Sequence, residues 1–110
     1  MPTNRAAWLT APEAYPLEVK ESPYPTCGPD DVIIENKAVA VNPVDWKMQA
    51  YDFYITNYPA IEGCDLAGTI VEVGSNIKHL EVGDRVLGHG PNIMYVETVR
   101  FGCGICAKTN

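Results

Sequence analysis

Short apolar runs separated by turn residues recur along the chain. Residues 6–9 form an apolar run that ends at the Thr-Ala-Pro turn of residues 10–12, which predicts a first strand. Residues 17–21 (LEVKE) alternate apolar and polar positions, as a half-buried strand does. The clearest strand signal is the β-branched segment 32–41 (VIIENKAVAV), whose polar centre at 35–37 predicts exposure or a bulge midway.

The second half of the chain continues this pattern. Strands are predicted at residues 69–73 and 85–87, beside turns at 74–76 and 83–84, and a weaker strand at 94–99. No window shows a sustained apolar period of 3.6 residues, and the 9 Gly and 9 Pro favour many turns over long helices. The pattern therefore predicts a mainly β domain, either a small barrel or a sandwich.

One short helix is expected after the Asn-Pro step at residues 42–43, over residues 44–50. Its start would present free backbone N–H groups and a positive dipole end, which suit phosphate or amide groups of a ligand. Lys47 adds a flexible cation, and Asp45 is placed to accept a hydrogen bond near the helix start. On residue types alone the plainer alternative is favoured, in which Asp45 caps the helix, Trp46 is core and Lys47 is solvated.

Composition narrows the classes of partner. With 110 residues the chain has room for one domain, and its formal charge is −6 from 14 acidic and 8 basic side chains. The sequence shows no basic stripe, which disfavours nucleic acid and an anionic membrane surface. It also has no secretory apolar segment at its start and no run near the ~20 apolar residues of a membrane span. We therefore expect a cytoplasmic protein with reduced cysteines, at Cys27, Cys64, Cys103 and Cys106.

Three motifs in register carry a family resemblance. NPVDWK at residues 42–47, PAIEGCDLAGTIVEVG at 59–74 and VGDRVLGH at 82–89 occur in this order. Together they resemble the GroES-like N-terminal domain of medium-chain dehydrogenases/reductases, and within that superfamily the zinc-independent quinone oxidoreductases and fungal trans-enoyl reductases. The resemblance leads us to expect a GroES-like domain over residues 1–90 and a tail over 91–110 that lies outside the family pattern.

The resemblance implies a partly open β-barrel with one or two short helices, packed against a separate Rossmann domain. A nicotinamide cofactor, NADP(H) in preference to NAD(H), would lie between the two domains. The stretch matching Val44, Asp45, Trp46 and Lys47 lines that cofactor cleft in similar proteins. The implied reaction is hydride transfer from NAD(P)H to a small-molecule activated alkene, such as an enoyl thioester or a quinone-like acceptor. Members of the family are often monomers or homodimers, and the sequence identifies no catalytic residue.

The same resemblance argues against zinc. Zinc-dependent relatives use a Cys at the position of Asn42, whose amide is a poor zinc ligand, and a His at the position of Cys64. The Cys103-x-x-Cys106 pair lacks a third and a fourth ligand nearby, and no βαβ context favours a thioredoxin-like redox pair. We therefore expect no metal site.

Several remaining residues have plain interpretations. Tyr51, Phe53 and Tyr54 either wall a hydrophobic substrate pocket or cover the end of the barrel, and both alternatives stay open. His79 and His89 have no recognisable triad partner and are expected to be surface residues. The glycines of the second half spell no dinucleotide fingerprint, and we expect turn and close-packing roles for Gly63, Gly68 and Gly74. Asp84 and Arg85 are expected to make a local turn contact.

The chain carries no Rossmann motif, and this affects the expected activity. We expect the 110-residue polypeptide by itself to be inactive, and the tail at residues 91–110 to reflect a truncation or a gene-model artefact. Two alternatives from other classes remain open. One is a non-catalytic GroES-like module for binding or oligomerisation, and the other is a small metal-binding domain built on Cys103 and Cys106.

Overall fold

The computed structural model describes residues 4–52, 55, 57–61, 63–89, 96–100 and 106–108, the last two ranges as backbone only. Each predicted strand has a counterpart, and the described strands are β1 (Arg5–Leu9), β2 (Glu18–Glu21), β3 (Asp31–Val39), β4 (Ala60–Ile61), β5 (Asp65–Val73), β6 (Arg85–His89), β7 (Val96–Arg100) and β8 (Cys106–Lys108). The helix α1 (Pro43–Tyr51) covers the predicted range and begins at the proline.

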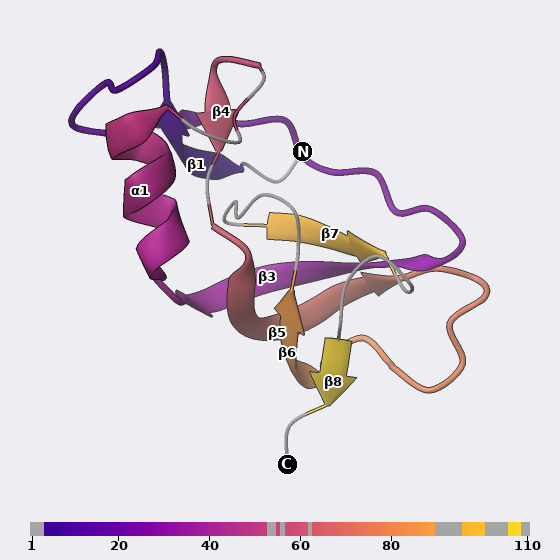
Figure 1. The fold of residues 1–110 in the computed structure, drawn as a ribbon. Helices are drawn as coiled ribbons and strands as arrows, with labels where there is room; N and C mark the ends of the chain where they lie inside the picture. Colours follow the sequence, from indigo (N-terminus) through magenta and orange to yellow (C-terminus); the bar gives the residue numbers. More distant parts are fainter. Residues whose placement is uncertain are drawn as a thin grey trace.

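The described strands form two antiparallel sheets. One has the order β2-β1-β4, and the other has the order β7-β3-β5-β6-β8. Figure 1 shows the smaller sheet and α1 at one end of the molecule, and the five-stranded sheet at the other. The predicted mainly β fold with a short helix is therefore confirmed.

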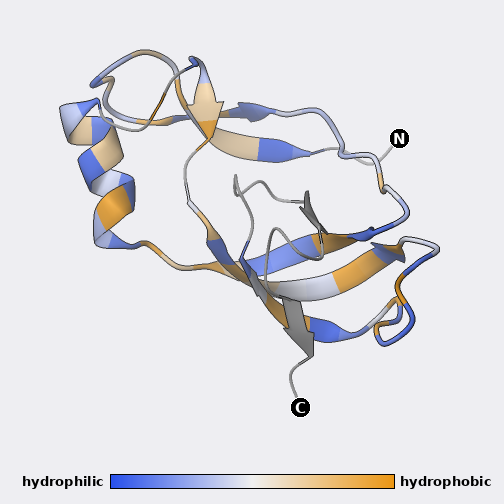
Figure 2. Cartoon of the chain, turned by 45° about the vertical axis from the view of Figure 1, so that its right-hand side comes forward, coloured by the Kyte–Doolittle hydropathy of each residue, from blue (hydrophilic) through white to orange (hydrophobic). Residues whose placement is uncertain are grey.

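The main apolar core lies against the five-stranded sheet. Its buried cluster consists of Val32, Ile34, Leu66, Ile70, Leu80 and Val86. In Figure 2 the apolar segments of β3 and β5 lie next to each other, as their pairing requires. Burial of such side chains stabilises a fold by about 1.5–3 kcal/mol each, so this cluster holds β3, β5 and β6 together.

The polar centre of β3 produces the irregularity that the sequence indicated. The pairing of β3 with β5 shifts register between Ile33 and Ile34 and again between Asn36 and Ala38. An extra residue in one strand is a β-bulge, which bends the strand and re-aims its side chains. Asn36 is buried and Lys37 is exposed, so the polar centre is only partly on the surface.

One expectation about burial is wrong. All four residues of β2 are exposed, although its alternating sequence predicted a half-buried strand. The physical reason is position, because β2 is the outer strand of the smaller sheet and alternation buries a face only where another element packs on it. The ammonium of Lys20 lies 5.8 Å from the centroid of the Trp8 ring on β1.

Two glycines permit close backbone contacts, as expected. A Cβ atom on Gly68 would lie 2.2 Å from the backbone oxygen of Glu35, and one on Gly74 would lie 2.3 Å from the backbone oxygen of Gly28. No side chain fits at these distances, so only glycine allows β5 to approach β3 here. The strand β5 starts earlier than predicted, because it runs through residue 68 to Asp65.

The helix contributes little to the core. None of its nine residues is buried. Within the described part of the chain, no helix has the length and apolar character that crossing a membrane requires.

Gly68→Ala is expected to destabilise the fold by about 1–3 kcal/mol or more, because the added methyl group must push β3 away from β5. The measurement is the urea midpoint of unfolding followed by circular dichroism. The matched control is Thr69→Ser, which removes one methyl group at the next, half-buried position of β5 and is expected to cost about 0.8 kcal/mol or less. Equal midpoints for Gly68→Ala and the unmodified chain would contradict the close approach.

Candidate functional site

The start of α1 is held by hydrogen bonds between Asn42 and Asp45. The backbone N–H of Asn42 donates to Oδ2 of Asp45 over 2.8 Å, and the backbone N–H of Asp45 donates to the Asn42 carbonyl over 3.0 Å. The first of these bonds is half of a capping box, and Pro43 occupies the first helical position, where its missing N–H costs nothing. Asp45 therefore accepts a hydrogen bond at the helix start, as predicted.

The other side chains at the helix start are available to a ligand. Trp46 is 49% exposed and Val44 is 40% exposed, so the alternative in which Trp46 is a core residue is wrong. The Lys47 ammonium lies 5.6 Å from the centroid of the Trp46 ring, and the Trp46 and Tyr51 ring centroids are 6.1 Å apart. A helix this short is marginally stable by itself. A hydrogen bond from the Gln49 side chain to the Ala14 carbonyl attaches it to the rest of the chain.

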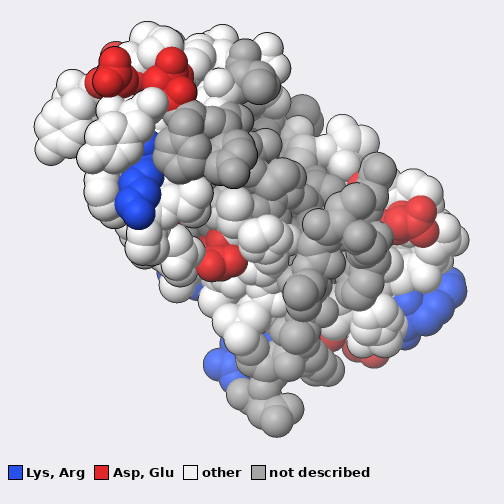
Figure 3. Space-filling view, viewed as in Figure 1, with Lys and Arg blue, Asp and Glu red and all other residues white. Residues whose placement is uncertain are grey.

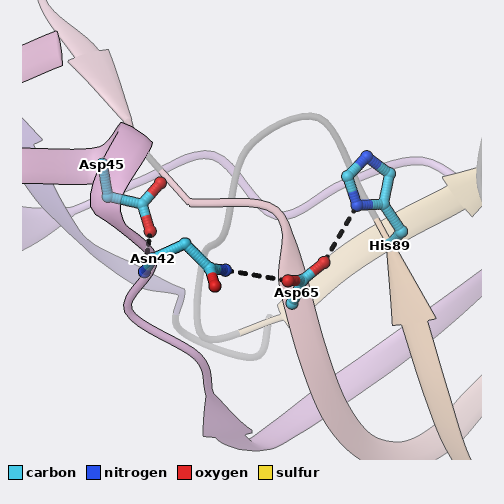
Figure 4. A network of polar contacts seen from close by, with 4 residues as sticks. All are labelled: Asn42, Asp45, Asp65 and His89. Atoms are coloured by element: carbon cyan, nitrogen blue, oxygen red, sulfur yellow. Dashed lines mark hydrogen bonds and ion pairs between the residues drawn. The ribbon is translucent and has the colours of Figure 1, made fainter. Parts of the chain in front are cut away.

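A polar network connects this helix start to the five-stranded sheet. The Nδ2 amide of Asn42 donates to Oδ2 of Asp65 over 2.8 Å, and Oδ1 of Asp65 lies 3.0 Å from Nδ1 of His89. Figure 4 shows Asp45, Asn42, Asp65 and His89 in a row, with dashed lines between successive members. Asp65 and His89 are directly opposite each other in the pairing of β5 with β6. The sheet register therefore creates the contact between the carboxylate and the imidazole.

The carboxylate of Asp65 sets the electrostatics of this network. The pKa of Asp65 is lowered, first by the hydrogen bond from His89, then by the bond from the Asn42 amide and by the charge of His89, while partial desolvation opposes the shift. An ionised carboxylate only accepts hydrogen bonds, so the proton of a neutral His89 ring belongs on Nδ1. The ring then presents Nε2 to its surroundings, where it can accept or carry a second proton.

An open hollow adjoins the network. It has a volume of about 310 Å³ and is lined by Ala38, Val39, Ala40, Asp65, Leu66, Ala67 and Leu87. Six of these seven residues are apolar, and Asp65 is the charged one. Ala67 and Leu87 are also opposite each other in the pairing of β5 with β6, two residues from Asp65 and His89 on each strand. Side chains two residues apart in a strand point to the same face of the sheet. The hollow and the Asp65–His89 pair therefore share one face of the sheet.

Of the three residues of the predicted aromatic pocket, Tyr51 lies within the described part of the chain. Tyr51 is 66% exposed at the end of α1 and is not one of the residues that line the hollow. Phe53 and Tyr54 lie outside the described residues. The assignment of these three residues to a substrate pocket stays a prediction.

The resemblance places zinc ligands of other family members at the positions of Asn42 and Cys64. The Asn42 amide donates a hydrogen bond to Asp65, and Cys64 is half-buried with no disulfide. Among the residues that the structure describes, no group of three or more His, Cys, Asp or Glu side chains is arranged to hold a metal ion. The side chains of Cys103 and Cys106 lie outside the described part.

Two smaller expectations concern local and surface groups. The Asp84 carboxylate accepts the backbone N–H of Glu81, which confirms a local turn contact for this residue. On the face shown in Figure 3, the described Lys and Arg side chains are separate spots among the acidic ones.

Sequence reasoning missed the partnership of His89. This residue was expected to be an isolated surface histidine, and its side chain is indeed 53% exposed, but it pairs with Asp65. The signal was an acid at the start of one strand and a histidine at the end of its antiparallel neighbour. It was hidden because the predicted strand began at residue 69, which left Asp65 in a loop.

Because the Asp65 carboxyl has a lowered pKa, its contribution to stability is present above the ordinary value of 3.8 and is lost as the pH falls through the lowered value. We expect the ¹³C signal of its side-chain carboxyl to titrate below 3.8 in an NMR pH series. His89→Phe removes the largest cause and raises this midpoint. His79→Gln, at the other histidine, is the control and leaves the midpoint unchanged. A midpoint at or above 3.8 in the unmodified chain would rule out the network in solution.

Comparison with known proteins places this site in a family context. Residues 28–109 match the Alcohol dehydrogenase GroES-like domain. This match includes residues 91–109, which we expected to lie outside the family pattern, and β7 and β8 within that segment pair with β3 and β6.

Curated fungal proteins are similar over most of the chain. Dehydrogenase orsE of Emericella nidulans is 45% identical over 86% of the chain and 27% of its own length. The zinc-binding alcohol dehydrogenase domain-containing protein cipB of the same species is 46% identical over 78% of the chain and 27% of its own length. Trans-enoyl reductase himH of Aspergillus japonicus is 40% identical over 90% of the chain and 29% of its own length. The chain thus spans less than a third of each of these relatives.

Solved structures share the fold. The quinone oxidoreductase of Coxiella burnetii superposes with a TM-score of 0.81 at 21% identity, over 94% of this chain and 37% of that one. The Escherichia coli quinone oxidoreductase complexed with NADPH gives a TM-score of 0.75 at 21% identity, over 94% of this chain and 32% of that one. With the domain match and the fungal relatives, these likenesses show that the chain belongs to the alcohol dehydrogenase GroES-like domain family, within the medium-chain dehydrogenase/reductase superfamily of oxidoreductases.

Proposed function

We propose that this chain forms the substrate-side domain of an NAD(P)H-dependent oxidoreductase that reduces an activated alkene without zinc. The observation that carries the proposal is that three features of the chain lie next to one another. The exposed start of α1, the Asn42–Asp65–His89 network and the apolar hollow adjoin one another. The similarity to a trans-enoyl reductase supports the choice of an enoyl or quinone-like substrate.

The residues at the helix start fit one part of a nicotinamide cofactor. Lys47 is exposed and offers a cation to a phosphate, and Trp46 offers an exposed indole surface. Asp45 uses Oδ2 for the Asn42 N–H and keeps Oδ1 as an acceptor for an amide or a hydroxyl. With Val44, these residues would hold the nicotinamide side of NADPH, which is favoured over NADH, and that cofactor supplies the hydride.

The donor set does not fit a catalytic zinc ion. Asn42 could offer zinc only its amide oxygen, which is a poor zinc ligand, because its amide nitrogen donates to Asp65. The carboxylate is in turn engaged on both oxygens, by Asn42 and by His89. Polarisation of a substrate carbonyl would then come from hydrogen-bond donors of the chain.

The apolar hollow is the proposed place of the alkene. Its alanine, valine and leucine side chains exclude water from a hydrophobic segment, and Asp65 marks its polar end. Tyr51, Phe53 and Tyr54 are proposed as further contacts of the same substrate.

The activity proposed here belongs to a longer protein. The chain covers 27% to 29% of the fungal relatives named above, and the described residues contain one helix and no βαβ unit that would bind a dinucleotide. We therefore propose that residues 1–110 alone do not turn over NADPH.

The first prediction is that the purified 110-residue chain gives no protein-dependent NADPH oxidation with a crotonyl thioester or a quinone, measured at 340 nm. Sequencing of the transcript across the codons for Gly88–Asn110 is expected to show an open frame that continues into a Gly-rich βαβ motif. Turnover by residues 1–110 would contradict the proposal. A stop codon after Asn110, with a defined oligomer in light scattering, would favour the binding or oligomerising module instead.

A second prediction concerns Lys47 in the longest polypeptide that the transcript encodes. Lys47→Ala is expected to raise the KM for NADPH about tenfold, the equivalent of about 1.4 kcal/mol, with a smaller effect on kcat. Lys78→Ala is the matched control, because Lys78 is an exposed lysine that donates to the Ser75 carbonyl in the loop after β5. Identical KM values for the Lys47 variant and the unmodified enzyme would remove Lys47 from the cofactor site.

A further inference from the structure

We propose that His89, oriented by Asp65, is the catalytic proton donor of this domain and delivers a proton from Nε2 to the α-carbon of the alkene. The proposal rests on the reductase function proposed above and supplies a residue that the sequence did not identify. It is carried by the contact of His89 with Asp65 and by their position beside the apolar hollow.

Asp65 determines the orientation of the His89 ring. Asp65 lies between two donors, because Asn42 occupies Oδ2 at 2.8 Å and His89 occupies Oδ1 at 3.0 Å. With Oδ2 held by the Asn42 amide, Oδ1 faces Nδ1 of the imidazole. A histidine whose Nδ1–H is bonded to a carboxylate is fixed in ring orientation and in tautomer. Its Nε2 is the atom left to exchange protons with a substrate, as Figure 4 shows by the side of the ring that faces away from Asp65.

The Asp65–His89 pair lies beside the apolar hollow. Asp65 itself lines the hollow, and His89 is its direct partner across β5 and β6. Ala67 and Leu87 continue the same face and form apolar walls. An alkene that occupies the hollow would therefore have the imidazole at its polar end. The third member, Asn42, directly precedes α1, whose first turn is the proposed nicotinamide site.

Reduction of the alkene needs a proton as well as a hydride. Reduction breaks the π bond of the alkene and forms two C–H bonds, one at the β-carbon from the hydride of a dihydronicotinamide and one at the α-carbon from an acid. Protonated His89 would supply that proton from Nε2 and become neutral, and the dihydronicotinamide, when bound, would supply the hydride and so be the group that is oxidised. The side chain of His89 is 53% exposed, so water can return the proton between turnovers.

The described ionisable groups closest to the His89 ring in the network lie on β5 and α1. On β5 the ionisable group in contact with His89 is Asp65, whose Oδ1 lies 3.0 Å from Nδ1 of the ring. On α1 the nearest member of the network is Asp45, one hydrogen bond beyond Asn42. The strand β8 pairs with β6 through Val86, Leu87 and Gly88, one residue short of His89. The described groups of the network are thus two carboxylates, one amide and the imidazole itself.

The orientation can be tested on the 110-residue chain, because it contains two histidines. Long-range ¹H–¹⁵N NMR spectra distinguish the two tautomers of each ring, and His79→Gln assigns the signals. We expect neutral His89 to carry its proton on Nδ1 in the unmodified chain and to lose this preference in Asp65→Ala. An Nε2–H tautomer in the unmodified chain, or the same tautomer in Asp65→Ala with the backbone spectrum preserved, would overturn the proposal.

The proton transfer is tested in the longest polypeptide that the transcript encodes, with NADPH and a crotonyl thioester. His89→Gln keeps a hydrogen-bond donor toward Asp65 but cannot donate a proton, so kcat is expected to fall about 100-fold or more. The alkaline decline of kcat with pH, which reports loss of the acid, is expected to disappear in the same variant. The KM for NADPH stays within about twofold, and His79→Gln, the control, keeps both kcat and the pH profile.

The outcomes separate the two proposals. If the unmodified polypeptide does not reduce the crotonyl thioester or a quinone, the proposed function fails and the proton donor fails with it. If it is active and His89→Gln retains kcat, only the proton donor is overturned. A low kcat in His89→Gln with an unchanged pH profile indicates a structural role for the ring, and this result also overturns the proposal.

Discussion

The close approach of β5 to β3 at Gly68 is the constraint on which the rest of the site depends. A side chain at this position would collide with the backbone oxygen of Glu35, so the two strands meet only because residue 68 has none. The bulge between Asn36 and Ala38 lies directly beside this contact, and beyond it the register continues until the backbone N–H of Ala40 donates to the carbonyl of Asp65. That register brings the end of β3, and therefore the start of α1, next to the first residue of β5.

The side chain of Asp65 adds hydrogen bonds to this backbone arrangement. Its two oxygens accept from an amide on one side and an imidazole on the other, so one carboxylate connects the helix start with the end of β6. An exposed ion pair contributes little to stability, which makes a structural purpose a weak explanation for a carboxylate with two oriented partners. The arrangement instead holds two side chains in defined directions at the edge of an apolar hollow, which is what a reactive site requires.

The strands and the helix were accessible from sequence because each follows from local pattern. The β-branched run of β3 and the proline at the start of α1 determine their own elements with little help from the rest of the chain. The exposure of β2 and the pairing of His89 depend on which strands are neighbours and on their register, and neither is a local property. The early start of β5 shows the same limit, since the stretch from Asp65 to Gly68 is extended through its pairing with β3 and β6 and carries only a weak strand signal of its own.

The helix α1 is attached to the rest of the domain at few points, so its exposed surface can differ between relatives. None of its residues is buried, and the described contacts that hold it are at its first residues and at Gln49. Substitutions on its outward face therefore cost the domain little folding free energy, so this face can diverge while the sheet beneath it stays the same. A scaffold of this kind separates the residues that must be retained for folding from those that are free to adapt to a new small molecule.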